Sequence, residues 1–292
     1  MDQCILALGF FDGVHLGHGA LLRRTRALAD ELRLPAAALT FDTHPAELVR
    51  GQRVALLNTP REREMLMRER YGIDEVLTLH FDRGTMAQPW QSFVRDTVCG
   101  RFGAVHTVCG EDFRFGAGGR GTAALLQEEC ARLGVGCDCI AQVRMDGAPI
   151  SSTRIRALLE AGETAEAVRL LGHPHLLTGT VTQGKKLGRT LGIPTANLVL
   201  PDGILVPRFG VYAANAVFEG QTRRAVVNIG TRPTVNGQNV TVEPWILDFD
   251  GDLYGHELCL ELWDFLRPER KFGSLEELKA EILRNAEQVK HM

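Results

Sequence analysis

Residues 4–143 alternate between short apolar runs and segments with helical periodicity, and this alternation limits the fold more than any other feature of the chain. Strands and helices that take turns along a chain predict a parallel sheet with helices on both faces. Ligands of such sheets bind beyond the carboxyl ends of the strands, so the polar residues after each apolar run are the first to consider. We expect strands at residues 4–10, 35–41, 75–81, 105–110 and 137–143, and helices at residues 18–32, 60–72, 90–102 and 122–134.

The periodicity changes in the second half of the chain. Two short helices are expected at Ser152–Ala161 and Thr164–Leu171, and strand-like alternation begins near Thr178. Several short strands separated by turn signals predict an all-β barrel or sandwich. Residues 274–289 close the chain as an amphipathic helix, with Ser274 as N-cap and Glu277 completing a capping box. The strands are expected at residues 178–184, 196–200, 210–218, 223–230, 241–249 and 257–266.

Length and composition exclude several classes of protein. The 292 residues suffice for two domains, and we place them at residues 1–172 and 173–292. The net charge of −3 and the lack of a basic run argue against nucleic-acid binding. No apolar run approaches the roughly 20 residues of a membrane helix. Each domain can bury its own core, so we expect a monomer or a weak oligomer.

Cysteine usage points to a reducing compartment. The chain holds seven cysteines, an odd number, and no Cys-X-X-Cys pair, so a disulfide framework is not expected and the cytoplasm is the natural location. Cys137 and Cys139 alternate along an expected strand. We interpret them as buried free thiols, with a metal-binding pair as the weaker alternative.

The run GFFDGVHLGH, residues 9–18, follows the first expected strand and leads into the first expected helix. A helix N-terminus offers unpaired N–H groups and a partial positive charge, which attract phosphate. Glycine at positions 13 and 17 lets the backbone approach a ligand closely. His15 and His18 are three residues apart, so both can reach one anion. Zinc is the weaker interpretation, because no third ligand has convincing spacing.

Other polar motifs lie where the same ligand edge is expected. FDTHP (residues 41–45) and GEDFRFG (residues 110–116) both follow expected strands. SSTRIR (residues 151–156) places hydroxyl groups at a helix start, with Arg156 on the same face as Ser152. Taken alone, SSTRIR is an ordinary N-cap beside a surface arginine. Together with the histidine motif it suggests a second clamp on a triphosphate.

The second half carries its own candidate phosphate site. Gly184, Gly188 and Gly192 predict a loop whose N–H groups can surround phosphates, with Lys186 among the nearby cations. Thr195 and Asn197 alternate along the next extended segment, so their side chains share one face. A hydroxyl and an amide oxygen are hard ligands of the kind that Mg²⁺ takes.

These motifs, in this order, resemble a known family. GFFDGVHLGH with SSTRIR is similar to the nucleotidylyltransferase superfamily, and with FDTHP and GEDFRFG it resembles the adenylyltransferase module of the bacterial bifunctional riboflavin kinase/FAD synthetases. GTVTQGKKLGRTLGIPTANL (residues 179–198) resembles the glycine-rich loop and Pro-Thr-Ala-Asn motif of their riboflavin kinase module. The resemblance covers essentially the whole chain. It implies a Rossmann-like α/β domain with a parallel sheet, then a small barrel of Greek-key type and a C-terminal helix.

The resemblance also implies an activity and a set of site residues. Riboflavin and Mg²⁺·ATP would give FMN in the barrel, and FMN and a second ATP would give FAD and pyrophosphate in the α/β domain. Glu243 takes the family's catalytic-base position in the kinase, where Thr195 and Asn197 bind the metal–nucleotide complex and Gly184, Lys186 and Gly188 bind phosphate. Arg267 and Glu269 would line the flavin site. In the adenylyltransferase the catalytic residues would be His15, His18 and Arg156, and the ATP contacts would be Gly9, Phe10, Phe11, Asp12, Gly17, Asp112, Ser152 and Thr153.

The chain departs from the family pattern at a few positions. Phe10 and Thr43 stand where asparagine and proline are common, and neither change removes a charged group. Pro244 and Trp245 follow Glu243 where a small residue and a histidine are usual. Because proline removes a ladder hydrogen bond, we expect an edge or a bulge there. Two other functions stay open at this point: a nucleotidylyltransferase with a different acceptor, and a flavin-binding regulatory protein with little catalysis.

Overall fold

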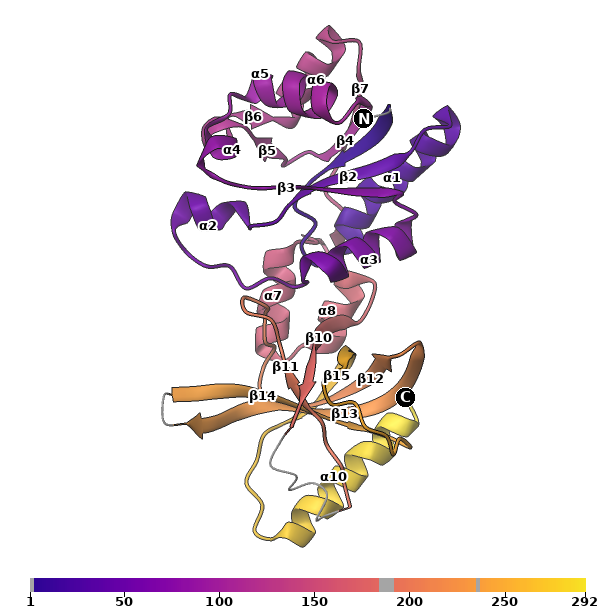
Figure 1. Cartoon of the computed structure of the whole chain (residues 1–292), viewed down its shortest axis with the longest axis vertical. Helices are drawn as coiled ribbons and strands as arrows, with labels where there is room; N and C mark the ends of the chain where they lie inside the picture. Colours follow the sequence, from indigo (N-terminus) through magenta and orange to yellow (C-terminus); the bar gives the residue numbers. More distant parts are fainter. Residues whose placement is uncertain (1–2, 184–191, 235–236) are drawn as a thin grey trace. The chain divides into compact units, whose positions relative to one another are not determined.

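The computed structural model describes residues 3–183, 192–234 and 237–292 (Figure 1). Contacts between residues divide the chain into two compact units, Met1–Ser152 and Thr153–Met292. Each unit has its own hydrophobic core, and each is described separately below.

The first unit is built on a five-stranded sheet in the order β3-β2-β1-β4-β7, in which all neighbouring pairs are parallel. Strand β1 lies at the centre and every one of its residues is buried, because β2 and β4 flank it and helices cover the sheet. This confirms the expected Rossmann-like domain. The strands are β1 (Cys4–Leu8), β2 (Ala36–Phe41), β3 (Glu75–Leu79), β4 (Ala104–Gly110) and β7 (Gly136–Ile140), and the long helices are α1 (Leu16–Leu32), α3 (Pro60–Tyr71) and α6 (Ala123–Arg132).

One expected helix has a different form. Residues 90–102 begin as a single turn, α5 (Trp90–Ser92), and continue as a π-helix over Phe93–Arg101. The amide of Phe102 reaches back five residues to the carbonyl of Thr97 at 3.1 Å. Both helix types bury the apolar residues of this segment on one side, so periodicity alone does not separate them. Short elements that the periodicity did not indicate are α2 (Pro45–Arg50), α4 (Arg83–Ala87), the strand pairs β5 (Arg114–Phe115) with β6 (Gly121–Thr122) and β8 (Arg144–Met145) with β9 (Ala148–Pro149), and a 3₁₀ turn at Ala117–Gly119.

The second unit is a closed barrel in the order β10-β11-β14-β13-β12-β15, with every neighbouring pair antiparallel. Its interior is filled by apolar side chains that alternate along the strands, including Leu177, Tyr212, Val227 and Leu260. The barrel expected from the second half is thus confirmed. Its strands are β10 (His175–Thr182), β11 (Asn197–Val199), β12 (Gly210–Phe218), β13 (Gln221–Thr234), β14 (Gly237–Ile246) and β15 (Glu257–Pro268), and helices α7 (Ser152–Ala161) and α8 (Thr164–Leu171) precede them.

Helix α10 (Leu275–Lys290) packs its apolar face on the outside of the barrel, where Ala286 and Val289 join a cluster with Val211 and Val226 (Figure 1). Its N-cap is Ser274, as expected, with Oγ accepting from the amide of Glu277 at 3.1 Å. The Glu277 carboxylate accepts from the amide of Gly273 at 2.9 Å, so the capping box is shifted by one residue.

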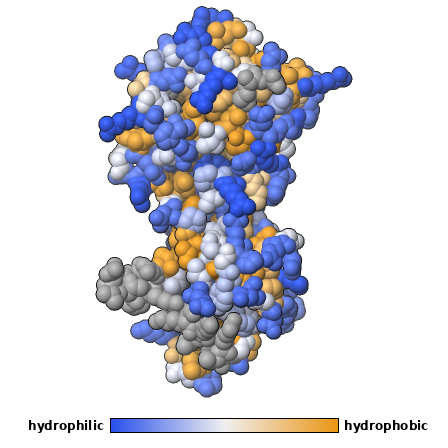
Figure 2. All heavy atoms as spheres, in the orientation of Figure 1, coloured by the Kyte–Doolittle hydropathy of each residue, from blue (hydrophilic) through white to orange (hydrophobic). Residues whose placement is uncertain are grey.

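Hydrophilic residues cover much of the face drawn in Figure 2, with hydrophobic ones grouped between them. Among the described residues, no helix has the length and apolar character needed to cross a membrane.

Candidate active sites

The turn after β1 is a strained loop at the carboxyl end of the central strand. Phe11, Gly13 and Val14 have φ angles of 58°, 81° and 38°, in the left-handed region that costs energy for Phe and Val. Phe11 is fully buried, and its packing in the interior fixes the position of the turn. Strain of this kind persists only where the surrounding structure enforces it, so the loop has one well-defined shape at the ligand edge of the sheet.

His15 and His18 stack on each other at the start of α1. The ring centroids are 3.6 Å apart with an interplanar angle of 12°. His15 is the N-cap of the helix, and its Nδ1 accepts from the amide of His18 at 3.2 Å. In a neutral His15 the proton is therefore on Nε2, which can donate to an anion.

The imidazole of His18 is prepared for a negatively charged ligand. Burial, the adjacent His15 and the cation of Arg63 hold the pKa of His18 well below its usual range. Its Nδ1 atom is buried and has no hydrogen-bond partner among the described residues. A bound triphosphate would reverse the electrostatic balance, because a nearby negative charge favours the protonated imidazole.

Gly17 lies directly against the His15 ring. A Cβ at this position would be 3.0 Å from Cε1 and Nδ1 of His15. We therefore expect Gly17→Ala to lower by about tenfold the FAD formation that the resemblance implies for this turn, because a small misplacement of a positioning group is costly. The melting temperature should not fall, since alanine favours a helix over glycine by about 1 kcal/mol. An FAD-forming rate equal to that of the wild type, measured by chromatography, would contradict this role for Gly17.

Asp12 and Ser152 hold the turn rather than face solvent. The Asp12 carboxylate is buried and accepts from the amide of Leu57 at 2.9 Å. Its backbone carbonyl accepts from Oγ of Ser152 at 2.9 Å, across 140 residues of sequence. The structure thus brings the turn together with Ser152 of the SSTRIR motif. Thr153 and Arg156 lie further along α7, in the segment assigned to the second unit, and their roles remain predictions.

Arg63 is a residue of this site that the sequence did not single out. It comes from α3 and is 1 % exposed. Its Nη1 donates to the carbonyls of Phe10 and Phe41 and to Oγ1 of Thr40, and its guanidinium lies 4.2 Å from the centroid of the Phe10 ring. Its Nε and Nη2 atoms have no partner among the described residues, so this buried cation still has donors to offer.

Asp112 occupies the neighbouring loop on the same edge of the sheet. It follows β4, which pairs with β1, and its exposed carboxylate accepts from Nε2 of Gln142 at 3.3 Å. Gly110, at the end of β4, leaves the carboxylate room, since a Cβ there would be 3.0 Å from Oδ1 of Asp112. Asp112 is therefore placed where a ligand of this edge can reach it.

Two of the cavities in the described part of the barrel share Thr195. One, of about 500 Å³, is lined by Gly192, Thr195, Asp250 and Tyr254 among others. The other, of about 370 Å³, is lined by Thr195 and Glu243. A phosphate donor in the first cavity and a hydroxyl acceptor in the second would thus meet beside Thr195.

Glu243 and Trp245 both line the second cavity, because residues two apart on β14 share a face. The pairing of Asn228 with Glu243 and of Val226 with Trp245 is continuous, without the bulge that Pro244 suggested. Strand β14 pairs fully with β13 but meets β11 only at Val242 and Leu198. Pro244 therefore lies on a side of β14 that has little regular pairing, where a missing N–H costs least.

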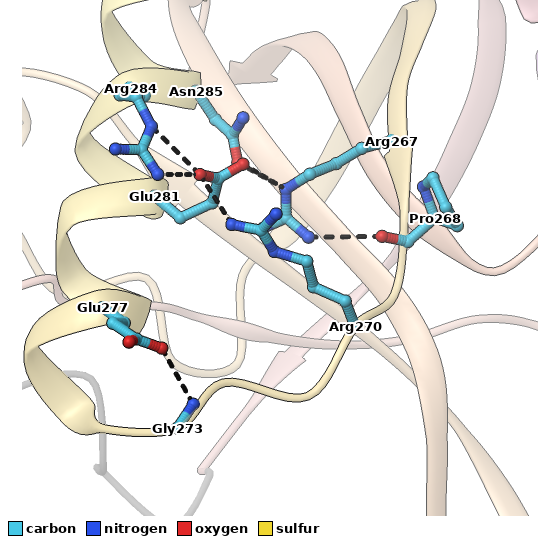
Figure 3. A network of polar contacts seen from close by, with 8 residues as sticks. All are labelled: Arg267, Pro268, Arg270, Gly273, Glu277, Glu281, Arg284 and Asn285. Carbon is cyan, nitrogen blue, oxygen red and sulfur yellow. Dashed lines mark hydrogen bonds and ion pairs between the residues drawn. The ribbon is translucent and has the colours of Figure 1, made fainter.

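Three arginines surround Glu281 at the edge of this second cavity (Figure 3). Arg267, from β15, forms an ion pair with Glu281 at 3.3 Å and donates from Nε to Asn285 at 3.1 Å. Arg270 reaches the same carboxylate at 2.9 Å, and Arg284 pairs with it from the next turn of α10. Arg267 thus lines the second cavity, and its contacts with Glu281 and Asn285 of α10 hold it in place. The contribution of Glu281 was not visible in the sequence, where it is one of several helix-surface carboxylates.

The remaining site residues have mixed outcomes. Glu269 lines the second cavity and lies over Gly230, where a Cβ would be 2.1 Å from Oε1. Asn197 begins β11 and is half-buried. Gly9 fits under the Phe11 ring, since a Cβ would be 3.0 Å from it. Gly184, Lys186 and Gly188 lie outside the described residues.

Both sites suit phosphate chemistry: a helix N-terminus with buried imidazoles in one unit, and a carboxylate and hydroxyl in adjoining cavities in the other. The fold and these two groups of residues are typical of an enzyme that transfers phosphoryl and nucleotidyl groups. Family models match as FAD synthetase over residues 1–154 and as riboflavin kinase over residues 171–292. The chain therefore belongs to the family of bifunctional riboflavin kinase/FMN adenylyltransferases.

Individual relatives agree with this assignment. The chain is 39% identical over 286 residues to the bifunctional riboflavin kinase/FMN adenylyltransferase of Escherichia coli, covering 97% of this chain and 91% of that protein. It is 32% identical over 291 residues to the Bacillus subtilis protein of the same name, covering 98% and 92%. A crystal structure described as a macrolide-efflux protein from Streptococcus pneumoniae matches with a TM-score of 0.90 and 30% identity, covering 100% of this chain and 95% of that one.

Proposed function

We propose that this protein makes both flavin cofactors, phosphorylating riboflavin to FMN with ATP and then adenylylating FMN with a second ATP to give FAD and pyrophosphate. The observation that carries the proposal is that Glu243 and Thr195 line one cavity of the barrel. The stacked histidines meanwhile cap α1 in the other unit. Each half of the reaction sequence thus has its own group of residues.

In the kinase step, Glu243 orients the ribityl 5′-hydroxyl of riboflavin and accepts its proton. The hydroxyl oxygen bonds to the γ-phosphorus of ATP as the bond to the β,γ-bridging oxygen breaks, and ADP leaves. The family uses ATP, generally with a divalent metal, and we propose that the metal is Mg²⁺. The side-chain oxygens of Thr195 and Asn197 fit this ion, which neutralises phosphate charge when it is bound.

In the adenylyl step, an oxygen of the FMN phosphate attacks the α-phosphorus of ATP, and pyrophosphate leaves. No enzyme nucleophile is needed, because positioning and charge neutralisation carry the reaction. We assign the holding of the triphosphate to His15, His18, Ser152 and Arg156, and add Arg63 because its unpaired Nη2 is buried beside the turn. Phe10, Phe11, Asp12, Gly17 and Thr153 shape the ATP site, and Asp112 contacts ATP or FMN.

The assay that tests the function is incubation with riboflavin, ATP and Mg²⁺, followed by chromatography. We expect FMN to accumulate first and FAD later. If only FMN forms, the proposed adenylyltransferase activity is excluded and the kinase remains. If neither FMN nor FAD forms, both activities are excluded and a flavin-binding protein remains. A nucleotidylyltransferase with another acceptor would consume ATP only when that acceptor is supplied. Chelation followed by addition of Mg²⁺, Mn²⁺ or Ca²⁺ tests which metal restores each step.

The second cavity, of about 370 Å³, has the size and aromatic lining for the flavin ring, with Trp245 and Phe272 among its residues. Stacking on an aromatic ring is worth about 1 kcal/mol beyond area burial. We expect Trp245→Ala to raise the KM for riboflavin about tenfold, which corresponds to about 1.4 kcal/mol. Riboflavin should quench the fluorescence of the wild type and of a Trp263→Phe control, but quench Trp245→Phe less. Equal quenching in both variants would place the ring elsewhere.

We also propose that the protein acts in the cytoplasm as a monomer or weak oligomer and binds neither nucleic acid nor membranes. The two domains are proposed at residues 1–172 and 173–292. Size-exclusion chromatography with light scattering tests the first statement. Expression of residues 1–172 and of residues 173–292 as separate chains tests the second, since each is expected to fold and to keep its own activity.

A further inference from the structure

Four cysteine thiols, those of Cys109, Cys130, Cys137 and Cys139, meet in the first unit in a place that neither proposed reaction uses. We call this group the thiol cluster. On the paired strands β4 and β7, Thr107 is the partner of Cys137 and Cys109 is the partner of Cys139. Residues two apart on a strand share a face, so the side chains of Thr107, Cys109, Cys137 and Cys139 all lie on one side of the sheet. Cys130, on α6, packs in the same core cluster.

The four thiols belong to one packed cluster. Cys109 lies directly opposite Cys139 on the neighbouring strand, and Cys137 lies directly opposite Thr107. Oγ1 of Thr107 is 3.7 Å from Sγ of Cys130, so Cys130 packs beside the strand pair that carries Cys137. Neighbouring positions of this kind are the first condition for closing a disulfide, because the two sulfurs must then approach to about 2 Å.

The thiols of the cluster differ in exposure. Strand β7 is an edge strand of the sheet, and Cys137 and Cys139 on it are half-buried, whereas Cys109 and Cys130 are fully buried. A small oxidant thus meets Cys137 or Cys139 before the two inner thiols. The adjacent Cys109 and Cys130 thiols lower the pKa of Cys137, and the adjacent Cys137 together with burial raises the pKa of Cys130. The thiolate is the reactive form toward peroxides.

A metal is the other ligand that clustered thiols suggest. Within the described residues, however, no group of three or more histidine, cysteine, aspartate or glutamate side chains is arranged to hold a metal ion. Thiols that share one cluster without such an arrangement are suited to disulfide formation instead.

We propose that the thiol cluster is an oxidative modification site, in which a peroxide converts Cys137 and either Cys109 or Cys130 into a disulfide that lowers FAD formation. The Cys137 thiolate attacks one oxygen of the peroxide, giving a sulfenic acid and hydroxide. The sulfur of the second cysteine then bonds to the sulfenic sulfur, and the hydroxyl group leaves as water. Two thiols are oxidised, and one hydrogen peroxide is reduced to two waters.

The effect on FAD formation rests on the proposed function and follows from where β4 ends. Cys109 is next to Gly110, the last residue of β4, and Asp112 follows in the loop assigned to ATP or FMN. The same loop is tied to the end of β7, since the Glu111 amide donates to the carbonyl of Ile140 at 3.0 Å. A disulfide that draws β4 toward β7 or α6 moves this loop.

The test uses the full chain, reduced and then treated with hydrogen peroxide. Remaining thiols are alkylated, and peptides are mapped by mass spectrometry. We expect Cys137 to be linked to Cys109 or Cys130, while Cys259, a half-buried thiol of the barrel, stays free and serves as the internal control. A Cys137 that stays alkylatable, or that ends as a sulfinic acid without a disulfide, would overturn the proposal.

Variants separate the site from general oxidation. Cys137→Ser should abolish the disulfide and Cys259→Ser should not. If Cys137→Ser fails to fold by circular dichroism, the double variant Cys109→Ser/Cys130→Ser, which keeps Cys137, should leave that residue as a sulfenic or sulfinic acid. A disulfide that persists in a folded variant would contradict the assignment.

Activity provides the second readout. After peroxide, FAD formation from supplied FMN should fall about tenfold, the scale expected for a displaced binding group, and dithiothreitol should restore it. Riboflavin phosphorylation should not change. Unchanged FAD formation in a sample shown to contain the disulfide would overturn the proposal. A reduced enzyme that makes no FAD would instead count against the proposed function, while the peptide map would still decide the modification.

Discussion

Replacing Glu243 by glutamine is expected to lower riboflavin phosphorylation by at least about 10²-fold, the usual contribution of a general base. The amide keeps the size of the side chain and its place beside Thr195 in the second cavity, but it cannot accept the proton of the ribityl hydroxyl. The loss should fall on kcat, with the KM for riboflavin changing little, because the proton is transferred only as the bond to phosphorus forms. FAD formation from supplied FMN should continue at the wild-type rate.

Two control variants sharpen this expectation. Glu261→Gln changes a carboxylate of the same barrel that accepts from Asn215 at 2.8 Å and lines neither cavity, so it should retain kinase activity. Glu243→Asp keeps a carboxylate base but shortens the side chain by one methylene group. Its kinase activity should lie between those of the wild type and the glutamine variant. Kinase activity of Glu243→Gln within a few fold of the wild type would sink the assignment of this residue as the base.

Much of the fold could be predicted because its periodicities are strong. The run of residues 210–218 became β12 with the same limits, and the two helices at Ser152–Ala161 and Thr164–Leu171 appear as α7 and α8. The π-helix after Trp90 could not be predicted, since it buries the same apolar residues as an α-helix would. The local apolar pattern indicates which side of a segment is buried. It does not indicate whether the backbone hydrogen bonds are those of an α-helix or of a π-helix.

The candidate site likewise contains residues that could be predicted from the sequence and residues that only the structure shows. Glu243 and Arg267 were expected from the family resemblance and Thr195 from the alternation of its segment, and all three line one cavity. Arg63 was missed because α3 has several arginines and only the tertiary structure shows that this one is buried under the turn. Asp12 is predicted as part of the ATP site, and only the structure shows that its carboxylate accepts from the Leu57 amide. Partners brought together from distant segments leave no local signal.

The thiol cluster is a third case of this kind. Alternation on β7 indicated that Cys137 and Cys139 share a face, but the register with β4 and the docking of α6 decide which thiols they meet. Spacing along the sequence indicates on which face of a strand a side chain lies. Which side chain it meets on the neighbouring strand or helix is known only from the folded structure.

Replacing His18 by alanine is expected to reduce FAD formation from FMN by about 10²–10³-fold, the cost of removing one preorganised donor to a developing charge. In the free enzyme burial holds the pKa of His18 low, so the ring is neutral at pH 7. The triphosphate supplies negative charge beside it, which raises the affinity of the ring for a proton as pyrophosphate leaves. His15 loses its stacking partner at 3.6 Å in the same variant, so its position is weakened as well.

The kinase provides the internal control for His18→Ala. The residue lies in the first unit, so riboflavin phosphorylation by the same preparation should match the wild type, which shows that the barrel is folded, and circular dichroism shows whether the first unit is folded as well. His80→Ala removes an exposed histidine that follows β3 in the same unit but lies outside the turn, and it should retain FAD formation. Chromatography of FMN and FAD over time measures both steps in one sample. Loss of both activities in His18→Ala would mean that the two halves are not separable, and loss in His80→Ala equal to that in His18→Ala would mean that the stacked pair has no special role.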